Sequence, residues 1–398
     1  MPTPFKILHL KNGSYEKCIV KRNAVNRVLA MHLNGLFQET FLVFFKTDTD
    51  RNFDLHAQCH IYDSSGVHTF FSKIGLKCID TFLSELKLLS FVCTLIKNEG
   101  ISVVTADEPF VTGLNACCIS FLTGKPFVIY NLADFDLFFK IGGHRNIPFV
   151  PRCIERTLER FVLHNASMVI TDRDFYRAYV LKRGARPQRC CSTRVTTDAF
   201  YYTASCEPGF RKEPAWEGKK ILFYFGRLHP EKKTDHLIRC LAHITETRSD
   251  VVLIVAGEGA QLDELKKLSA SLDVAENVFF LGNRNNQELV NLMSVSDILL
   301  ATHAGYSLLE MALSGKPIIA FDYEWHSEFI ENNVTGILVP DADSIAMAQA
   351  AVRLLSDSAI SKQIGETAKE KARSFYNYPD ALADEEKCFK RLLKVETK

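Results

Sequence analysis

Two cations follow a strongly apolar stretch near the middle of the chain. Gly226-Arg227-Leu228-His229-Pro230-Glu231-Lys232 comes directly after Ile221–Phe225, which we predict to be a buried strand, and the helical pattern of Asp235–Ala242 follows. Arg227 and Lys232 are therefore expected at the carboxyl end of a strand, close to a helix N-terminus. Two cations beside a helix dipole can bind a diphosphate. Charge and position alone leave a solvated basic turn as the alternative.

A glycine turn and a carboxylate follow another predicted strand, Ile298–Ala301. The segment reads Thr302-His303-Ala304-Gly305-Tyr306-Ser307-Leu308-Leu309-Glu310, and Ser307–Leu313 has a helical pattern. Backbone N–H groups of Gly305–Leu309 are placed to point at an anion. Glu310 has apolar neighbours, so its carboxylate, if buried, must be paired or must bind a ligand hydroxyl. A salt-bridged structural glutamate is the alternative.

Small residues followed by polar ones end two further predicted strands. These turns are Val255-Ala256-Gly257-Glu258-Gly259 and Leu281-Gly282-Asn283-Arg284. A glycine at such a turn lets a nucleotide base approach the backbone. Glycine after a strand is common, so an ordinary βα turn is the favoured interpretation of either one taken singly.

Short apolar runs alternate with helix-like stretches along the whole chain, which predicts parallel sheets covered on both faces. The predicted strands are Lys6–Leu10, Thr40–Phe45, Ile101–Thr105, Lys125–Tyr130, Ile221–Phe225, Val251–Ala256, Val278–Leu281, Ile298–Ala301, Pro317–Phe321 and Gly336–Val339. The longest predicted helices of the first half are Ser72–Lys97 and Phe110–Leu122. No internal repeat interrupts this pattern.

A Pro-, Gly- and charge-rich stretch at Ser205–Lys219 predicts a domain boundary. We therefore expect an α/β protein of two Rossmann-like domains, residues 1–205 and 206–375, with a last helix over 376–398 returning to the first domain. The bend at Phe375–Pro379 suits that return, because Pro379 limits helix continuation. Two such domains leave a cleft, and ligands of open α/β sheets bind at the carboxyl ends of the strands.

The composition excludes several classes of protein. Lys and Arg number 48 against 47 Asp and Glu in 398 residues, which argues against a dedicated nucleic-acid binder. No apolar run reaches the length of a membrane span, and the first residues lack a signal-peptide core. The 12 cysteines contain no C-x-x-C pair, which indicates reduced thiols of a cytoplasmic protein rather than a zinc site or a disulfide scaffold.

Taken together, the motifs of the second half resemble glycosyltransferase family 4. They are Arg227 and Lys232 in G-R-L-H-P-E-K, the glycine turn, Glu310 in S-L-L-E-M-A-L-S-G-K-P, and V-T-G-I-L-V-P at Val334–Pro340. Their order and spacing match from about Gly218 to Phe375, while the first half matches only in general layout. The resemblance implies a GT-B fold, in which two domains face each other across a cleft, and a retaining enzyme that uses a nucleotide-sugar donor.

The resemblance also implies roles for individual residues. Arg227 and Lys232 would hold and stabilise the departing diphosphate without a metal ion or other cofactor. Glu310 would bind the ribose hydroxyls, and Asn283 and Arg284 would lie by the base. The remaining donor-binding residues implied by the motif positions are Gly226, His303, Gly305, Tyr306, Ser307, Leu308 and Leu309.

The chain departs from the family pattern at several positions. Thr302 stands where the family has a second Glu, and Asp322–Glu328 lacks both glycines of the family's D-x-G-G-x-P-E. Leu132 takes the place of a histidine in the first domain, and the first glycine loop is reduced to Lys11–Ser14. The candidate substitutes are His303, Glu324, His326 and Asp134, and for each a surface or structural role is the alternative. The residues that we assign to the acceptor or sugar side are Asn12, Gly13, Asp134 and His326.

Basic residues concentrate in the first half. They include Arg145, Arg152, Arg156, Arg160, Arg173, Arg177, Lys182, Arg183, Arg186, Arg189 and Arg194, and the helix Ser72–Lys97 adds lysines beside Phe82, Leu86 and Leu89. Many relatives act on lipid-linked acceptors, and such elements bind anionic lipid at the cytoplasmic membrane face. A solvated face on a partly buried core helix is the alternative.

The sequence therefore predicts an enzyme of polysaccharide biosynthesis that transfers a sugar from a nucleotide-diphosphate donor to a glycan or lipid-linked glycan. The donor would bind the second domain and the acceptor the first. Two rivals remain: a non-catalytic GT-B subunit that binds a nucleotide sugar or a partner enzyme, and a nucleotide-sugar epimerase, which needs no acceptor.

Overall fold

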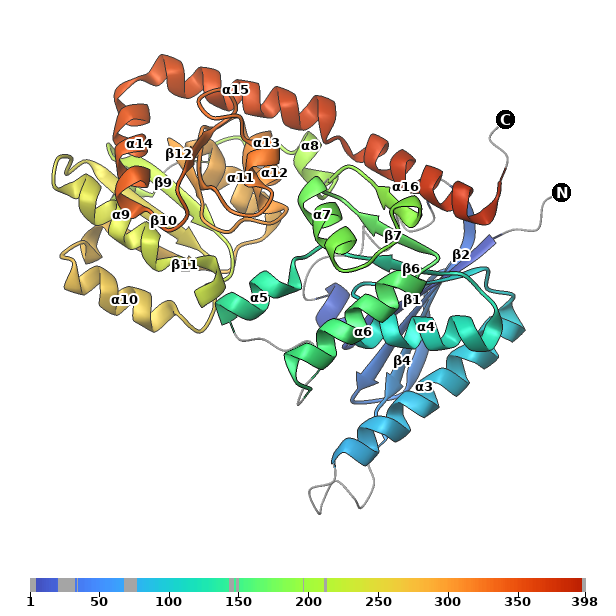
Figure 1. The fold of residues 1–398 in the computed structure, drawn as a ribbon. Coiled ribbons are helices and arrows are strands. Elements are labelled where there is room, and N and C mark those ends of the chain that lie inside the picture. The colour runs from blue at the N-terminus through green and yellow to red at the C-terminus, as the bar shows by residue number, and fades with distance from the viewer. Residues whose placement is uncertain are drawn as a thin grey trace. The chain divides into compact units, whose positions relative to one another are not determined.

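The computed structural model describes residues 5–20, 33, 35–67, 77–142, 147, 150–195, 197–210 and 213–395. Contacts divide the chain into two compact units (Figure 1). Unit 1 comprises residues 1–139, 144–193 and 379–398, and unit 2 comprises residues 140–143 and 194–378. The predicted boundaries lay at 205/206 and 375/376. Of the predicted helix Ser72–Lys97, residues 72–76 lie outside the described part.

Unit 1 contains an eight-stranded sheet of order β3-β4-β2-β1-β5-β6-β7-β8. Its strands are β1 (Phe5–Asn12), β2 (Phe37–Thr47), β3 (Arg51–His56), β4 (Cys59–Ser65), β5 (Val103–Ala106), β6 (Phe127–Tyr130), β7 (Met168–Thr171) and β8 (Cys190–Ser192). All neighbouring pairs are parallel except β3 and β4, which form an antiparallel hairpin at one edge.

The helices of unit 1 bury apolar faces against this sheet. They are α3 (Lys77–Glu99), α4 (Val111–Thr123), α5 (Phe135–Gly142), α6 (Arg152–Asn165), α7 (Asp174–Lys182) and α16 (Tyr378–Leu393). Helix α4 packs between α3 and α6 and contacts β1, β5 and β6 (Figure 1). Helix α16 is anchored by Phe389, whose ring packs edge-on against Phe37 at 5.2 Å, and by Glu385, which accepts a hydrogen bond from Tyr130.

Unit 2 contains a six-stranded, wholly parallel sheet of order β11-β10-β9-β12-β13-β14. Its strands are β9 (Lys220–Phe225), β10 (Val251–Ala256), β11 (Val278–Gly282), β12 (Ile298–Ala301), β13 (Ile318–Phe321) and β14 (Ile337–Val339). Every residue of β10, β12 and β13 is buried. Parallel strands covered on both faces read as such continuous apolar runs, which confirms the predicted α/β class.

Helices cover both faces of the unit 2 sheet. They are α8 (Phe200–Thr203), α9 (Asp235–Thr245), α10 (Leu262–Ser271), α11 (Asn286–Val295), α12 (Ser307–Leu313), α13 (His326–Phe329), α14 (Ser344–Ser356) and α15 (Ser358–Phe375). Helix α9 packs beside α14 and β10, whereas α12 packs beside α8 and α15. Among the helices of the described ranges, none has the length and apolar character needed to cross a bilayer.

Candidate functional site

The strand order of unit 2 reverses at β9. The chain runs from β9 outward to β10 and β11, and then from β12 to β13 and β14 on the other side. The turns leaving the carboxyl ends of β9 and β12 are therefore neighbours, and this is where open α/β sheets bind ligands. The first turn carries Gly226, Arg227 and Lys232, and the second carries His303 and Gly305.

Lys232 joins the two turns. Its Nζ donates a hydrogen bond of 2.8 Å to the carbonyl oxygen of His303, and the Thr302 hydroxyl donates one of 2.5 Å to the carbonyl oxygen of Lys232. Burial lowers the pKa of Lys232, while the neighbouring Glu231 carboxylate acts in the opposite direction. Thr302, which stands in the place of a family glutamate, thus helps to hold the predicted phosphate-binding lysine in position.

Arg227 is placed differently from Lys232. Its side chain is 71% exposed, and its Nη2 lies 2.5 Å from Oε1 of Glu231, four residues later in the chain. The Glu231 side chain is itself only 10% exposed. The guanidinium is therefore oriented by one carboxylate while its remaining donors face outward, which is a geometry suited to binding an anion.

The glycines after β10 let its turn press against the turn after β9. Gly226 N–H donates to the carbonyl of Ala256 at 3.0 Å, and Gly257 N–H donates to that of Gly282 at 2.8 Å. A Cβ atom at Gly257 would lie 1.9 Å from the carbonyl oxygen of Gly226, and one at Gly259 would lie 2.1 Å from that of Leu228. Both glycines are therefore required by close backbone approach.

Asn283 and Arg284 are exposed at the carboxyl end of β11. Asn283 Nδ2 donates to Glu258 Oε2 at 3.0 Å, and Arg284 Nε lies 4.0 Å from Oε1 of Glu288. Hydrogen bonds thus connect the turn after β9 to the turn after β10, and the turn after β10 to the turn after β11. Asn283 and Arg284, which we predict to lie by the nucleotide base, belong to the third of these turns.

Glu310 has a partner that the sequence did not suggest. Its Oε1 accepts a hydrogen bond of 2.7 Å from the hydroxyl of Thr197, which precedes α8. The Glu310 carboxylate and burial both raise the pKa of Tyr201, burial being the larger cause. No local pattern around Thr197 signals this contact, because the residues lie in segments brought together only by the fold.

Two backbone N–H groups of the glycine turn before α12 form hydrogen bonds within the turn. Leu308 N–H donates to the carbonyl of Gly305 at 3.2 Å, and Leu309 N–H donates to that of Tyr306 at 3.0 Å. Gly305 is exposed, while Tyr306 and Ser307 are half-buried. Of the predicted amide cradle, the Leu308 and Leu309 groups are therefore already used within the turn.

His303 is enclosed by residues from three other turns. Its ring stacks on Tyr323 at 3.4 Å between centroids with an interplanar angle of 6°, and its Nε2 lies 3.0 Å from Asp341 Oδ1. Its Nδ1 lies 2.5 Å from the Glu231 carbonyl oxygen. Asp341 directly follows the V-T-G-I-L-V-P motif, so its place after β14 was a signal that could have identified it.

The stability of unit 2 is expected to fall in acid because of His303. Burial, assisted by the Lys233 cation, lowers the pKa of His303 to about 4 against the opposing effect of Asp341. The unfolded chain then binds a proton that the folded chain rejects, so stability is complete above pH 6.5 and is lost as the pH falls toward 4. Denaturant titrations between pH 7 and pH 4 should show wild type losing about 3 kcal/mol more than His303→Gln. If the free energy of unfolding fell with pH by the same amount in both proteins, His303 would not be the cause of the acid sensitivity.

His326 is buried behind the glycine turn rather than exposed beside it. Its Nδ1 lies 2.7 Å from the carbonyl oxygen of Phe321, and its Nε2 lies 2.9 Å from that of Ala304. Both ring nitrogens are therefore engaged by the backbone. The geometry gives this histidine a role in holding the turn at Ala304.

The predicted acceptor-side residues of unit 1 have local roles. Asp134 Oδ1 accepts hydrogen bonds from the N–H groups of Asp136 and Leu137 at 2.9 and 3.0 Å, which caps α5. Asn12 is exposed at the end of β1, and Gly13 donates its N–H to Phe45 at 3.3 Å.

Several of the unit 1 arginines are neutralised by acids of the same unit. Arg152 pairs with Asp136 and with Glu155 at 2.9 Å each, and Arg183 also pairs with Asp136. Arg145 and the side chain of Lys77 lie outside the described part of the chain. Helix α3 presents Phe82, 63% exposed, and Leu86, 46% exposed, whereas Leu88 and Val92 are buried in the core.

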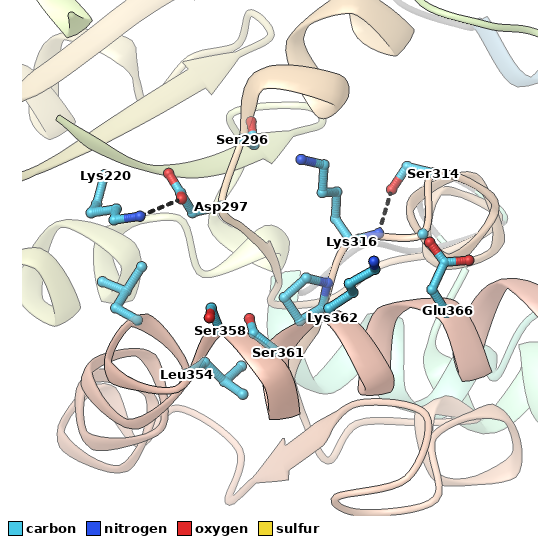
Figure 2. A pocket seen from close by; sticks show the side chains of 13 residues that line it. Lys220, Ser296, Asp297, Ser314, Lys316, Leu354, Ser358, Ser361, Lys362 and Glu366 are labelled. Atoms are coloured by element: carbon cyan, nitrogen blue, oxygen red, sulfur yellow. Dashed lines mark hydrogen bonds and ion pairs between the residues drawn. The ribbon is translucent and has the colours of Figure 1, made fainter. Parts of the chain in front are cut away.

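A separate pocket of about 320 Å³ lies at the opposite end of the unit 2 sheet (Figure 2). Lys220 begins β9, and its Nζ lies 3.1 Å from Oδ1 of Asp297, which precedes β12. Lys316 and Lys362 also line this pocket. Because these residues stand at the amino ends of the strands, the pocket does not include the candidate site. Within the described ranges, no cluster of three or more His, Cys, Asp or Glu side chains is arranged to hold a metal ion.

Comparison with known proteins finds sequence similarity in the second half of the chain. Residues 207–371 match the family model described as glycosyl transferases group 1. An uncharacterized glycosyltransferase of Methanocaldococcus jannaschii is 26% identical over 186 residues, covering 45% of this chain and 47% of that protein. The N-acetyl-alpha-D-glucosaminyl L-malate synthase of Bacillus anthracis is 28% identical over 39% of this chain and 41% of its own length. The chain thus spans less than half the length of each of these curated relatives.

The solved structures extend the likeness of fold to both halves. The Anabaena protein HepE in complex with UDP aligns with a TM-score of 0.74 at 18% identity, covering 98% of this chain and all of that one. The sucrose-phosphate synthase of Thermosynechococcus elongatus aligns with a TM-score of 0.77 at 15% identity, with the same coverage. The fold is GT-B, with two Rossmann-like domains, as the resemblance implied.

Proposed function

We propose that this protein, whose residues 207–371 match the family model of the group 1 glycosyl transferases, transfers a sugar from a nucleotide-diphosphate donor to a glycan or lipid-linked glycan with retention of configuration, as in family 4. The observation that carries the proposal is the junction of the turns after β9 and β12. Lys232 spans them through its 2.8 Å bond to the His303 carbonyl, and Arg227 stands exposed beside them.

The residues of this junction suit a departing nucleoside diphosphate. Negative charge develops on the diphosphate as the sugar leaves, and fixed cations lower the energy of that state. The carbonyl oxygen of His303 already holds the Lys232 side chain in position. Arg227 would have to leave its ion pair with Glu231 to contact the diphosphate. Glu310 would exchange the Thr197 hydroxyl for ribose hydroxyls. Such a site requires no metal ion for leaving-group stabilisation.

The acceptor is assigned to unit 1 on the same proposal. Helix α3 offers the exposed Phe82 and Leu86, and α4 ends in Phe121 and Leu122, which are 71% and 68% exposed. Exposed apolar side chains with lysines nearby suit peripheral contact with anionic lipid at the cytoplasmic membrane face. This contact would bring a lipid-linked acceptor to the enzyme.

Thermal shift with a panel of nucleoside diphosphates and nucleotide sugars tests donor binding. A ligand present at 100 times its Kd should stabilise the wild type by about 2.7 kcal/mol. Glu310→Ala should abolish the shift, whereas Glu366→Ala, which removes an exposed glutamate of α15, should retain it. If no nucleotide stabilises the wild type, the transferase proposal fails.

Product analysis then separates the two rival functions. A transferase consumes the donor only slowly unless a glycan acceptor is added. An epimerase converts the donor sugar without any acceptor, and a non-catalytic subunit binds the nucleotide but forms no product. Release of nucleoside diphosphate that depends on acceptor is the result expected here.

A further inference from the structure

Two cysteines far apart in the sequence meet in unit 1. Cys191 lies on β8, and Cys388 lies on α16. The thiols of Cys191 and Cys388 interact with each other in one buried cluster, Cys191 Sγ also lies 3.5 Å from Met168 Sδ, and the two cysteines are 6% and 7% exposed, respectively. The last strand of the unit 1 sheet and the last helix of the chain are thus joined through a pair of thiols.

The guanidinium of Arg391 contacts one of the two thiols. Arg391, which follows Cys388 by one turn of α16, places Nη2 at 2.9 Å from Cys191 Sγ. A cation at this distance stabilises a thiolate, which is the nucleophilic form of cysteine. The hydrogen bond from Cys388 is the largest cause that lowers the pKa of Cys191 to about 7, and Arg391 adds to it. The same hydrogen bond raises the pKa of Cys388 well above its usual value.

The two thiols therefore have different roles. The Arg391 contact favours ionisation of Cys191 rather than of Cys388, so Cys191 is suited to be the nucleophile and Cys388 its protonated neighbour. Cys190 provides a contrast, because burial raises the pKa of its thiol although it adjoins Cys191 in the chain. The charged groups that face these three cysteines are Arg177, Asp384, Glu385, Lys387 and Arg391.

The thiols are also accessible to small molecules. A pocket of about 300 Å³ is lined by Cys191, Cys388, Asp384, Lys387 and Arg391. The volume is at the lower end of that of small-molecule sites. Lys387 pairs with Asp384 at 3.7 Å, and Arg391 adds a second cation, so the charged side chains of the wall are positive on balance, which suits a reagent that carries carboxylates.

We propose that Cys191 and Cys388 form a reactive dithiol site that is oxidised by small carboxylate-bearing disulfides. The Cys191 thiolate attacks one sulfur of the small disulfide, whose S–S bond breaks, and the released thiolate takes a proton from solvent. Cys388 then loses its proton and attacks Cys191, which expels the second small thiol. Two protein thiols become one disulfide, and the small disulfide is reduced to two thiols.

The disulfide would have a defined structural effect within unit 1. It would connect β8, two residues before the chain passes into unit 2 at Arg194, to α16, which begins the return at Pro379. The α16 anchors at Glu385 and Phe389 flank the bond. Oxidation would therefore fix the last helix to the sheet covalently, and a reducing thiol would release it.

A pulse of iodoacetamide on the full chain, followed by peptide mass spectrometry, tests the thiolate. Labelling of Cys191 should be half-maximal near pH 7 and should exceed that of Cys190. Arg391→Gln should lower labelling of Cys191 at pH 7 by about tenfold and move its midpoint to higher pH. Arg373→Gln, on α15, is the matched control and should leave the profile unchanged. Equal labelling of Cys190 and Cys191, with no effect of Arg391→Gln, would overturn the proposal.

Oxidised glutathione tests the dithiol step. After incubation and digestion without reductant, a peptide that joins Cys191 to Cys388 should be the main oxidised product. In Cys388→Ser, which retains a hydroxyl donor, a mixed disulfide of glutathione with Cys191 should accumulate instead. Cys153 is exposed and serves as the reference for unassisted reaction. Glutathione found on Cys153 but absent from Cys191 in both proteins would refute the site.

Discussion

Arg227→Ala is expected to lower kcat for sugar transfer by about 10²–10³ while leaving the fold intact. The guanidinium is 71% exposed and is paired only with Glu231 among the contacts described. Its loss should cost little stability, because exposed ion pairs contribute about 1 kcal/mol or less. Its proposed role appears only when charge develops on the leaving diphosphate. Steady-state kinetics with saturating donor should therefore show the loss in kcat.

The comparison variants for this prediction follow from the structure. Arg239→Ala removes another exposed arginine of unit 2, one that pairs with Asp235 on α9, and should leave kcat unchanged. Arg227→Lys keeps the charge but loses the bidentate geometry, so we expect partial activity. Equal activity of wild type and Arg227→Ala would remove the arginine from the proposed leaving-group site.

Gly257→Ala is the second change with a large expected effect. The added Cβ would stand 1.9 Å from the carbonyl oxygen of Gly226, at a backbone φ of +145° that side chains rarely adopt. The Gly226 backbone cannot relieve the clash by a rotamer change, as a side chain could. The turns after β9 and β10 must therefore move apart. We expect a loss of about 3 kcal/mol or more in the free energy of unfolding, measured by urea denaturation.

Gly305→Ala is the matched control for the steric argument. Nothing lies within 4 Å of a Cβ built at Gly305, so its free energy of unfolding should stay within about 0.5 kcal/mol of wild type. Gly257→Ala should also weaken nucleotide binding, because Gly226 and Arg227 move with the turn. A Gly257→Ala protein as stable as Gly305→Ala would show that the turns are not in contact.

Fully buried strands were the easiest feature to predict from sequence. Strands β10 and β12 have the predicted bounds, Val251–Ala256 and Ile298–Ala301. Their residues are apolar throughout because helices cover both faces. The turns that follow such strands could then be located, and with them Arg227 and Lys232. The hairpin of β3 and β4 was missed, since its polar, partly exposed residues lack an apolar run.

Contacts between distant segments could not be predicted in the same way. Tyr323 and Asp341 reach His303 only because β13 and β14 follow β12 in the sheet. Thr197 reaches Glu310 because α8 packs against α12. The residue types are ordinary, and apart from the place of Asp341 directly after the V-T-G-I-L-V-P motif, their positions along the chain carry no signal. Only the order of the strands and the packing of the helices bring the side chains together.

The division of unit 1 along the chain has a consequence for biosynthesis. Phe37 and Tyr130 find their partners Phe389 and Glu385 on α16, which is translated after all of unit 2. A ribosome must therefore complete the second unit before the first can close over these side chains. Until α16 has been translated, the apolar surface that it covers in unit 1 is exposed. We therefore expect chaperones to bind the nascent chain at this surface.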